Sequence, residues 1–94
     1  KLSQLTCLSV IVHGWVQGVY FRAFVKQHAL NMGLKGYVRN LPHGEVEVKA
    51  EGERKRLEEL LPHLEKGPPG ARGVTILRKR LEYTGKLPRF EIRY

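Results

Sequence analysis

Two glycines, Gly14 and Gly18, separate two segments with different hydrophobic periods, and this junction constrains the fold more than any other feature. Residues 7–13 alternate between two faces, one of them wholly apolar, which is typical of a strand packed on one side. Residues 21–32 repeat apolar side chains every three or four positions, which is typical of a helix. The chain is therefore predicted to run from a strand through a tight loop into a helix. The predicted core positions of the strand are Leu8, Val10 and Val12, and those of the helix are Phe21, Val25, Ala29 and Met32, with Gly33 as the C-cap.

The loop leads into the N-terminus of the predicted helix, where backbone N–H groups have no partner within the helix. The helix dipole there favours an anion by about 0.3 to 1 kcal/mol. Arg22 lies in this first turn, where a cation is disfavoured by a similar amount unless an anion lies between it and the amides. We therefore expect a phosphate-binding loop. The alternative is that the glycines only turn the chain and Arg22 is an ordinary surface arginine.

The rest of the chain continues the alternation of strands and helices. The expected elements are a strand at 35–41, a turn at 42–44, a strand at 45–51, a helix at 53–64, a loop at 67–70, a strand at 74–81 and a closing strand at 90–94. Pro62 leaves the end of the second helix open, since the helix could kink there or finish. The order β-α-β-β-α-β predicts an α+β, ferredoxin-like sandwich: a four- to five-stranded antiparallel sheet with two helices on one face.

This topology brings distant parts of the sequence together. The first and second strands run parallel on either side of the third, so their carboxyl ends meet at one edge of the sheet. The loop after the first strand and Asn40 at the end of the second are therefore expected to converge.

Two stretches, 14–22 and 36–48, resemble the signatures of the acylphosphatase family. The signatures run Gly-x-Val-Gln-Gly-Val-x-(Phe/Tyr)-Arg and Gly-(aromatic)-Val-(Lys/Arg)-Asn-x-x-x-Gly-x-Val, with Phe21 and Tyr37 here at the aromatic places. Further matches are Ala29, Gly33-Leu34, Glu51-Gly52, Gly67-Pro68, Ala71 and Phe90-x-Ile92. The resemblance implies one domain, residues 1–94, that hydrolyses the carboxyl–phosphate bond of acyl phosphates without a metal or cofactor.

The resemblance also implies roles for individual residues. Arg22 and Asn40 would be catalytic, with Asn40 orienting the attacking water and the substrate's own phosphate taking its proton. The phosphate would be bound by Arg22 and by the backbone amides of Gln17, Gly18, Val19, Tyr20, Phe21 and Arg22.

The residues themselves exclude several phosphatase chemistries. Val16 stands where a cysteine-phosphatase loop needs its nucleophile, and the chain has no aspartate for an aspartyl phosphate or an Asp-held magnesium ion. Four histidines lack metal-ligand spacing and are interpreted as surface or packing residues. A pocket without a nucleophile, metal or general acid can help only a reactive substrate. Acyl phosphates qualify because their leaving carboxylate has a conjugate acid with a pKa of about 4.

Three positions depart from many family members. Val25 replaces a common threonine, Leu41-Pro42 replaces polar residues after the asparagine, and Trp15 replaces a common arginine. The first two put in doubt any support of the site through hydroxyl groups. Trp15 is interpreted as a partly exposed loop aromatic.

Seventeen basic and nine acidic residues give a net charge of +8, which favours anionic partners without choosing among them. The rival hypothesis is a nucleic-acid-binding module, because RNA-recognition domains share the topology and Lys35-Gly36-Tyr37 resembles part of their aromatic motif. That match lies on the second strand instead of the third, whose exposed face would carry Glu45, Glu47, Lys49 and Glu51. We therefore do not expect nucleic-acid binding as the primary function.

A third hypothesis is that the chain is one domain of a larger maturation or carbamoyl-phosphate-processing protein. The ending at 90–94 is a mild argument against this hypothesis. Instead we expect a monomer whose partners are a small acyl phosphate and inorganic phosphate or other anions as product or inhibitor. A lone Cys7 fits a reducing compartment, and no apolar run is long enough for a membrane span. The expected location is cytoplasmic, without membrane contact. We interpret Cys7 as a small buried hydrophobic residue.

Overall fold

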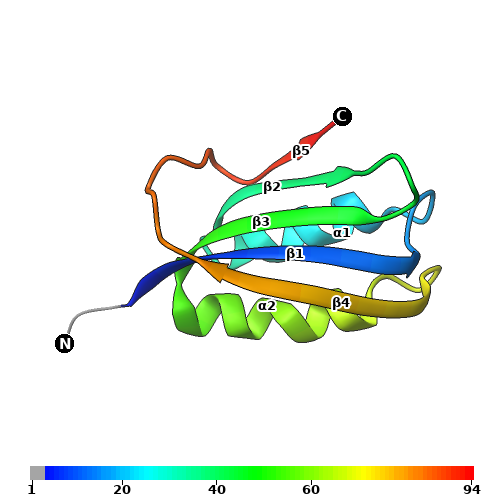
Figure 1. The fold of residues 1–94 in the computed structure, drawn as a ribbon, viewed down its shortest axis with the longest axis horizontal. Coiled ribbons are helices and arrows are strands. Elements are labelled where there is room, and N and C mark those ends of the chain that lie inside the picture. The colour runs from blue at the N-terminus through cyan, green and yellow to red at the C-terminus, as the bar shows by residue number, and fades with distance from the viewer. Residues whose placement is uncertain (1–3) are drawn as a thin grey trace.

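A computed structural model describes residues 4–94, which form two helices and a five-stranded sheet (Figure 1). The elements are β1 (Leu5–Trp15), α1 (Phe21–Asn31), β2 (Lys35–Asn40), β3 (Val46–Glu53), α2 (Arg54–Lys66), β4 (Arg72–Leu81) and β5 (Glu91–Arg93). Neither helix in this part of the chain combines the length and apolar character that crossing a bilayer requires.

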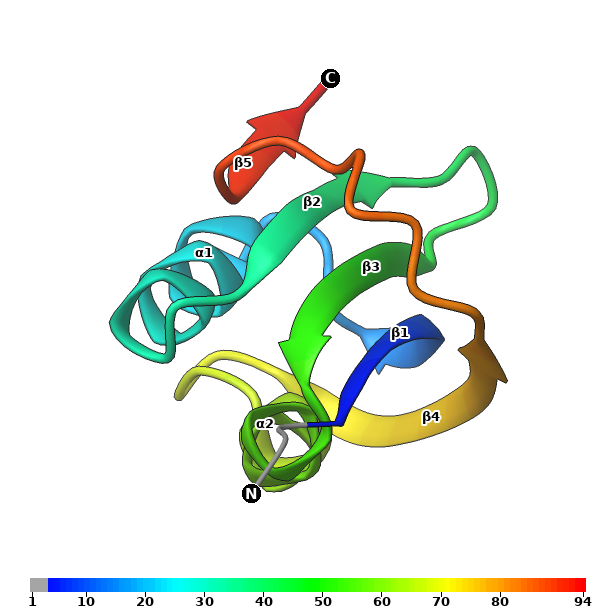
Figure 2. The ribbon, with the colours of Figure 1, turned by 90° about the vertical axis from the view of Figure 1, so that its left-hand side faces the viewer.

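The sheet has the strand order β4-β1-β3-β2-β5, and both helices cover the same face (Figures 1 and 2). β3 pairs antiparallel with β1 on one side and with β2 on the other, so β1 and β2 run in the same direction. α1 packs on β2 and β5, and α2 packs on β1, β3 and β4. The predicted ferredoxin-like α+β architecture is confirmed.

The expectation of a wholly antiparallel sheet is wrong, because β5 runs parallel to β2 with Glu91 opposite Tyr37. The direction follows from the path of the chain. β4 ends with Leu81 opposite Cys7, at the end of the sheet where β1 and β2 both begin. The connection crosses that end of the sheet, so β5 reaches β2 near its first residue and follows it.

Most element boundaries differ from the expectation by one or two residues, and among these are the C-terminal ends of β1 and α2. β1 continues beyond His13 to Trp15 across a register shift against β4. α2 continues beyond Pro62 to Lys66 and ends at Gly67, whose N–H donates to the His63 carbonyl at 2.8 Å. The ring of Pro62 is exposed, and its missing N–H removes one hydrogen bond of the helix. The buried leucines Leu60, Leu61 and Leu64 hold this part of the helix against the core.

The core lies between the sheet and the helices. The predicted residues Leu8, Val10 and Val12 are buried there, together with the helix residues Phe21, Val25, Ala29, Leu57, Leu60, Leu61 and Leu64. The C-terminus of α1 closes as predicted. Gly33 has φ +69°, its N–H donates to the Leu30 carbonyl, and the Leu34 N–H donates to the Ala29 carbonyl. These two hydrogen bonds form a Schellman motif, which turns the chain into β2.

On the opposite face of the sheet, Glu51 is a charged residue with only 2% of its surface exposed. Its carboxylate accepts hydrogen bonds from the N–H and hydroxyl of Thr84, at 2.7 and 2.8 Å, and from the N–H of Gly85 at 3.1 Å. Burial by itself would raise the pKa of Glu51, but these bonds and one from the Leu87 N–H outweigh it and lower the pKa. Glu51 therefore anchors the connection 82–90 that leads to β5.

Cys7 lies opposite Glu51 in the β1–β3 ladder and is buried, as predicted. Burial raises the pKa of its thiol, and the neighbouring carboxylate raises it further. The thiol is therefore held in its unreactive, protonated form.

We predict that Glu51→Gln lowers the free energy of unfolding by about 1 to 3 kcal/mol at pH 7, because the amide cannot replace the lost acceptor oxygen. A lowered pKa means that the wild-type advantage is full above about pH 4.3, the ordinary value, and disappears as the pH falls through the folded-state pKa. Urea unfolding at pH 7 and pH 3 measures this, with the exposed Glu65→Gln as the control. An equal difference between wild type and Glu51→Gln at both pH values would contradict the anchor.

Candidate active site

The loop between β1 and α1 has the backbone shape of an anion-binding turn. Gly18 has φ +76° and Tyr20, the N-cap of α1, has φ +64°, which is unusual for a residue other than glycine. The Tyr20 side chain makes no capping hydrogen bond, and no acidic residue lies in the first turn. The first bond of the helix runs from the Phe24 N–H to the Tyr20 carbonyl, at 3.1 Å. The N–H groups that precede it are therefore available to an anion.

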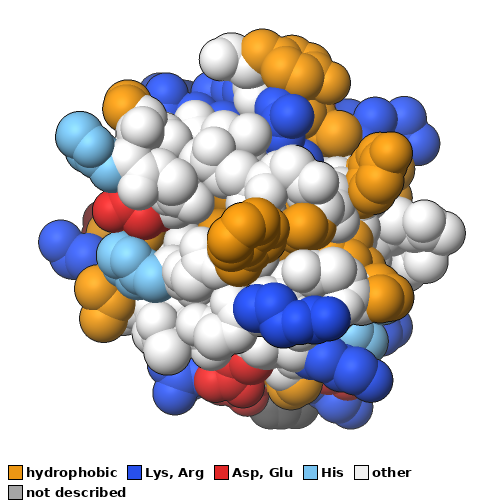
Figure 3. Space-filling view, turned by 90° about the vertical axis from the view of Figure 1, so that its right-hand side faces the viewer, with side chains coloured by type: hydrophobic (Ala, Val, Ile, Leu, Met, Phe, Trp, Pro, Cys, Tyr) orange, Lys and Arg blue, Asp and Glu red, His pale blue; other side chains and the backbone are white. Residues whose placement is uncertain are grey.

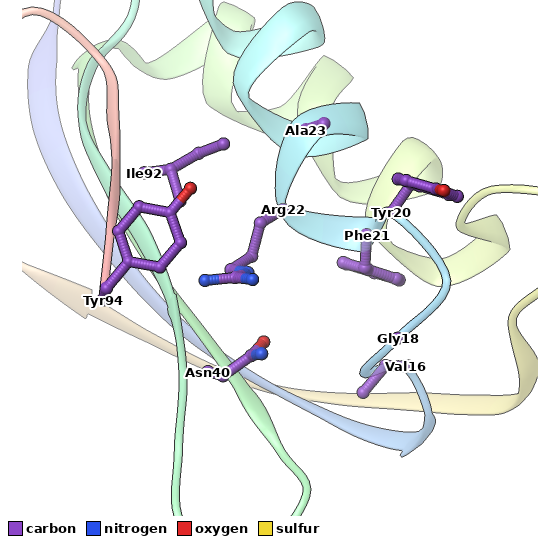
Figure 4. Close-up of a pocket in the computed structure, with 9 residues that line it drawn as sticks. All are labelled: Val16, Gly18, Tyr20, Phe21, Arg22, Ala23, Asn40, Ile92 and Tyr94. Atoms are coloured by element: carbon purple, nitrogen blue, oxygen red, sulfur yellow. The ribbon is translucent and has the colours of Figure 1, made fainter.

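Arg22 and Asn40 line one cavity of about 360 Å³ beside this loop. Figure 4 shows the guanidinium of Arg22, from α1, and the carboxamide of Asn40, from β2, pointing toward the same space. The carbon at the centre of the guanidinium lies 4.7 Å from the centroid of the Tyr94 ring. The nine lining residues are Val16, Gly18, Tyr20, Phe21, Arg22, Ala23, Asn40, Ile92 and Tyr94.

The predicted site residues are thus brought together in most cases. Gly18, Tyr20, Phe21, Arg22 and Asn40 share the cavity, which places the two sequence signatures at one edge of the sheet. Gln17 and Val19 do not line the cavity. Val19 packs against the core instead.

Gln17 has a structural function that sequence reasoning missed. Its side-chain amide donates to the carbonyls of Leu41 and Glu45, both at 2.8 Å. These two carbonyls flank the β2–β3 turn, where the Leu41 N–H also donates to the Glu45 carbonyl. Gln17 therefore ties the loop to the hairpin that carries Asn40. The only sequence signal for these hydrogen bonds is a side-chain carboxamide in a turn next to the end of a strand.

The departures from the family pattern are apolar or exposed in the structure. Val25 is fully buried in the core under α1, so no hydroxyl supports the site from this position. Trp15 is 69% exposed, as expected, although it is the last residue of β1 and not part of the loop.

The histidines lie away from the cavity. The rings of His28 and His63 stack at 4.0 Å between α1 and α2, which supports the packing interpretation for this pair. Burial lowers the pKa of His28, and His63 lowers it further. Within residues 4–94, no group of three or more His, Cys, Asp or Glu side chains is arranged to hold a metal ion.

Tyr37, part of the stretch that resembles the aromatic motif of RNA-recognition domains, contacts a neighbouring arginine. Tyr37 lies on the face opposite the helices, and the guanidinium carbon of Arg93 lies 4.1 Å from the centroid of its ring. The basic run 78–80 lies on the edge strand β4. One of its members, Arg80, approaches Glu58 of α2 at 4.0 Å.

Comparison with known proteins points to a single family. The family model described as Acylphosphatase matches residues 8–92. An acylphosphatase of Aeropyrum pernix is 49% identical over 87 residues, covering 90% of this chain and 85% of that protein. The crystal structure of acylphosphatase from Bacillus subtilis has a TM-score of 0.89 and 36% identity, covering 97% of this chain and all of that chain. An acylphosphatase structure from Coxiella burnetii has a TM-score of 0.87 and 39% identity, covering 95% and 93%.

We predict that the left-handed backbone at Tyr20 makes this position sensitive to β-branching. The side chain is 86% exposed, so its replacement removes little packing. Tyr20→Val should lower the free energy of unfolding by about 1 kcal/mol or more, because a β-branched residue disfavours φ +64°, whereas Tyr20→Asn should stay near wild type. Urea denaturation of the two variants measures the difference. Equal stability of both variants would mean that the loop relaxes to another conformation.

Proposed function

This chain belongs to the acylphosphatase family, and from that membership we propose how its residues carry out the reaction. The chain is an enzyme that hydrolyses acyl phosphates at the carboxyl–phosphate bond. The observation that carries the proposal is that Arg22, Asn40 and the N-terminus of α1 share one cavity.

We propose that the phosphate is held by Arg22 and by the N–H groups of the loop 17–22. The guanidinium carbon lies 4.7 Å from the centroid of the Tyr94 ring, and the guanidinium carries a fork of N–H donors suited to two phosphate oxygens. The first-turn amides and the helix dipole add positive potential on the other side of the anion. This accounts for a cation in a first turn that has no acidic residue.

Asn40 orients the attacking water. Its carboxamide offers one acceptor and two donors, and it cannot take a proton at neutral pH. The water oxygen attacks phosphorus, the bond between phosphorus and the acyl oxygen breaks, and the carboxylate leaves with the bonding electron pair. The proton of the water passes to a phosphate oxygen, so the products are a carboxylate and dihydrogen phosphate. Catalysis then consists mainly of positioning and charge stabilisation.

The groups around the cavity suit this substrate class. None of the nine lining side chains is a carboxylate, imidazole or thiol that could act as nucleophile, general acid or metal ligand. An alkyl phosphate would need protonation of a strongly basic leaving alkoxide, whereas a carboxylate leaves unaided. We therefore propose that the reaction requires neither a metal ion nor a cofactor.

Further proposals concern the setting of the enzyme. Residues 1–94 work as a single domain and a monomer, and inorganic phosphate competes with the substrate for Arg22. The buried, protonated thiol of Cys7 is compatible with the cytoplasm. Membrane and nucleic-acid partners are not part of the proposal.

Arg22→Gln should lower kcat/KM for acetyl phosphate and benzoyl phosphate by at least about 100-fold, because the amide lacks both the charge and the paired donors. Hydrolysis is followed by phosphate release in the presence of EDTA, which should leave the wild-type rate unchanged. Arg56→Gln, an exposed arginine on α2 that pairs with Glu59, is the matched control and should keep full activity. Full activity of Arg22→Gln would refute the assignment of the site.

Asn40→Ala should lower kcat more than it raises KM, because the carboxamide acts on the water and not on the bound phosphate. A loss of about 100-fold in kcat with less than about threefold change in KM is the expected result. Steady-state kinetics with benzoyl phosphate measure both constants. A raised KM with unchanged kcat would instead place Asn40 among the groups that bind the substrate.

A further inference from the structure

The cavity has a wall that the proposed chemistry does not use. Ile92 of β5 and the following Tyr94 line it beside Arg22 and Asn40 (Figure 4). β5 runs parallel to β2 with Ile92 opposite Val38, and alternate residues of a strand share a face. Tyr94 therefore follows Ile92 on the helix-covered side of the sheet, where Asn40 also lies.

The two side chains differ in how much apolar surface they leave open. Ile92 is half-buried and packs on the core, which fixes its position. Tyr94 is 99% exposed, and its ring lies against the guanidinium of Arg22. The Tyr94 ring therefore has apolar surface left to bury against a ligand in the cavity. Figure 3 shows this end of the molecule, where hydrophobic and basic side chains lie close together.

The size of the cavity indicates that more than a phosphate fits. A volume of about 360 Å³ is within the range of sites that take small organic ligands. Its polar donors come from the loop, Arg22 and Asn40, so the phosphoryl end belongs there. The acyl end of the substrate then faces the apolar part of the wall, to which Ile92 and Tyr94 contribute together with the buried Val16 and Phe21.

We propose that Ile92 and Tyr94 form an acyl-group subsite that favours acyl phosphates with an aromatic acyl group over those with a small aliphatic one. A planar aroyl group can pack on the Tyr94 ring where the ring borders the cavity. Ile92 contacts the edge of the aroyl ring. This inference rests on the proposed function, since it assumes that the phosphate binds at Arg22.

The test compares kcat/KM for benzoyl phosphate and acetyl phosphate, each as the ratio of variant to wild type. Tyr94→Ala should lower the value for benzoyl phosphate about three- to tenfold, the range that one aromatic pair contributes, and lower the value for acetyl phosphate much less. Ile92→Ala should lower the benzoyl phosphate value by a smaller factor. Tyr94→Phe should keep the wild-type ratio of kcat/KM between the two substrates, because the ring and not the hydroxyl forms the subsite.

Two control variants distinguish an acyl-group subsite at Tyr94 from a general effect of removing an exposed aromatic side chain. Tyr20→Ala, at the opposite rim, should change both substrates in parallel, and Tyr83→Ala, an exposed aromatic outside the cavity, should change neither. The inhibition constant of inorganic phosphate should be the same for Tyr94→Ala and wild type, which reports an intact phosphate site.

Equal losses with both substrates in Tyr94→Ala would overturn the proposal, because the ring would then act only by positioning Arg22. A loss confined to benzoyl phosphate in Tyr20→Ala would also overturn it and place the acyl group at the other rim. Hydrolysis of acetyl phosphate by wild type tests the proposed function separately. If wild type hydrolyses acetyl phosphate but no variant changes kcat/KM for benzoyl phosphate relative to wild type, the proposed function stands and the acyl-group subsite is refuted.

Discussion

The site depends on the register of one central strand. Val46 of β3 lies opposite Val12 of β1 on one side and opposite Asn40 of β2 on the other. These pairings place Asn40 level with Val12, three residues before β1 ends at Trp15 and the chain turns toward α1, and on the face that α1 covers. A slip by one residue would move every side chain of β2 to the opposite face. The ladder, with the bonds from Gln17 to the hairpin, therefore holds two remote signatures in one cavity.

We propose that the loop itself is arranged to bind an anion at some cost in stability. A tyrosine adopts a left-handed backbone at the N-cap, the cap has no side-chain partner, and the first charged residue of α1 is a cation. Each of these features opposes an isolated helix. Together they leave amides and a guanidinium directed at one space, which a doubly charged phosphate can neutralise. Positioned charge of this kind needs no reorganisation during the reaction, and this fits an enzyme whose substrate is already reactive.

The far end of the sheet contributes to the same site. Glu51 holds the connection 82–90, and that connection sets where β5 begins beside β2. β5 then carries Ile92 and Tyr94 to the cavity. A buried carboxylate on the face without helices therefore helps to position the strand that carries these side chains. The fold links stability at one end with the shape of the cavity at the other.

The sequence by itself determined the order of elements and the core faces, because periodicity, glycines and turn residues act over a few neighbours. The convergence of the loop that precedes Arg22 with Asn40 followed from that order, through the parallel first and second strands of the expected topology. The sequence did not determine the direction of β5, the continuation of α2 past Pro62 or the bonds of the Gln17 side chain. These depend on contacts between residues far apart in the chain. A three-residue strand has too little pattern to specify its partner, and an amide has no preferred acceptor until the fold supplies one. Only the tertiary structure could decide them.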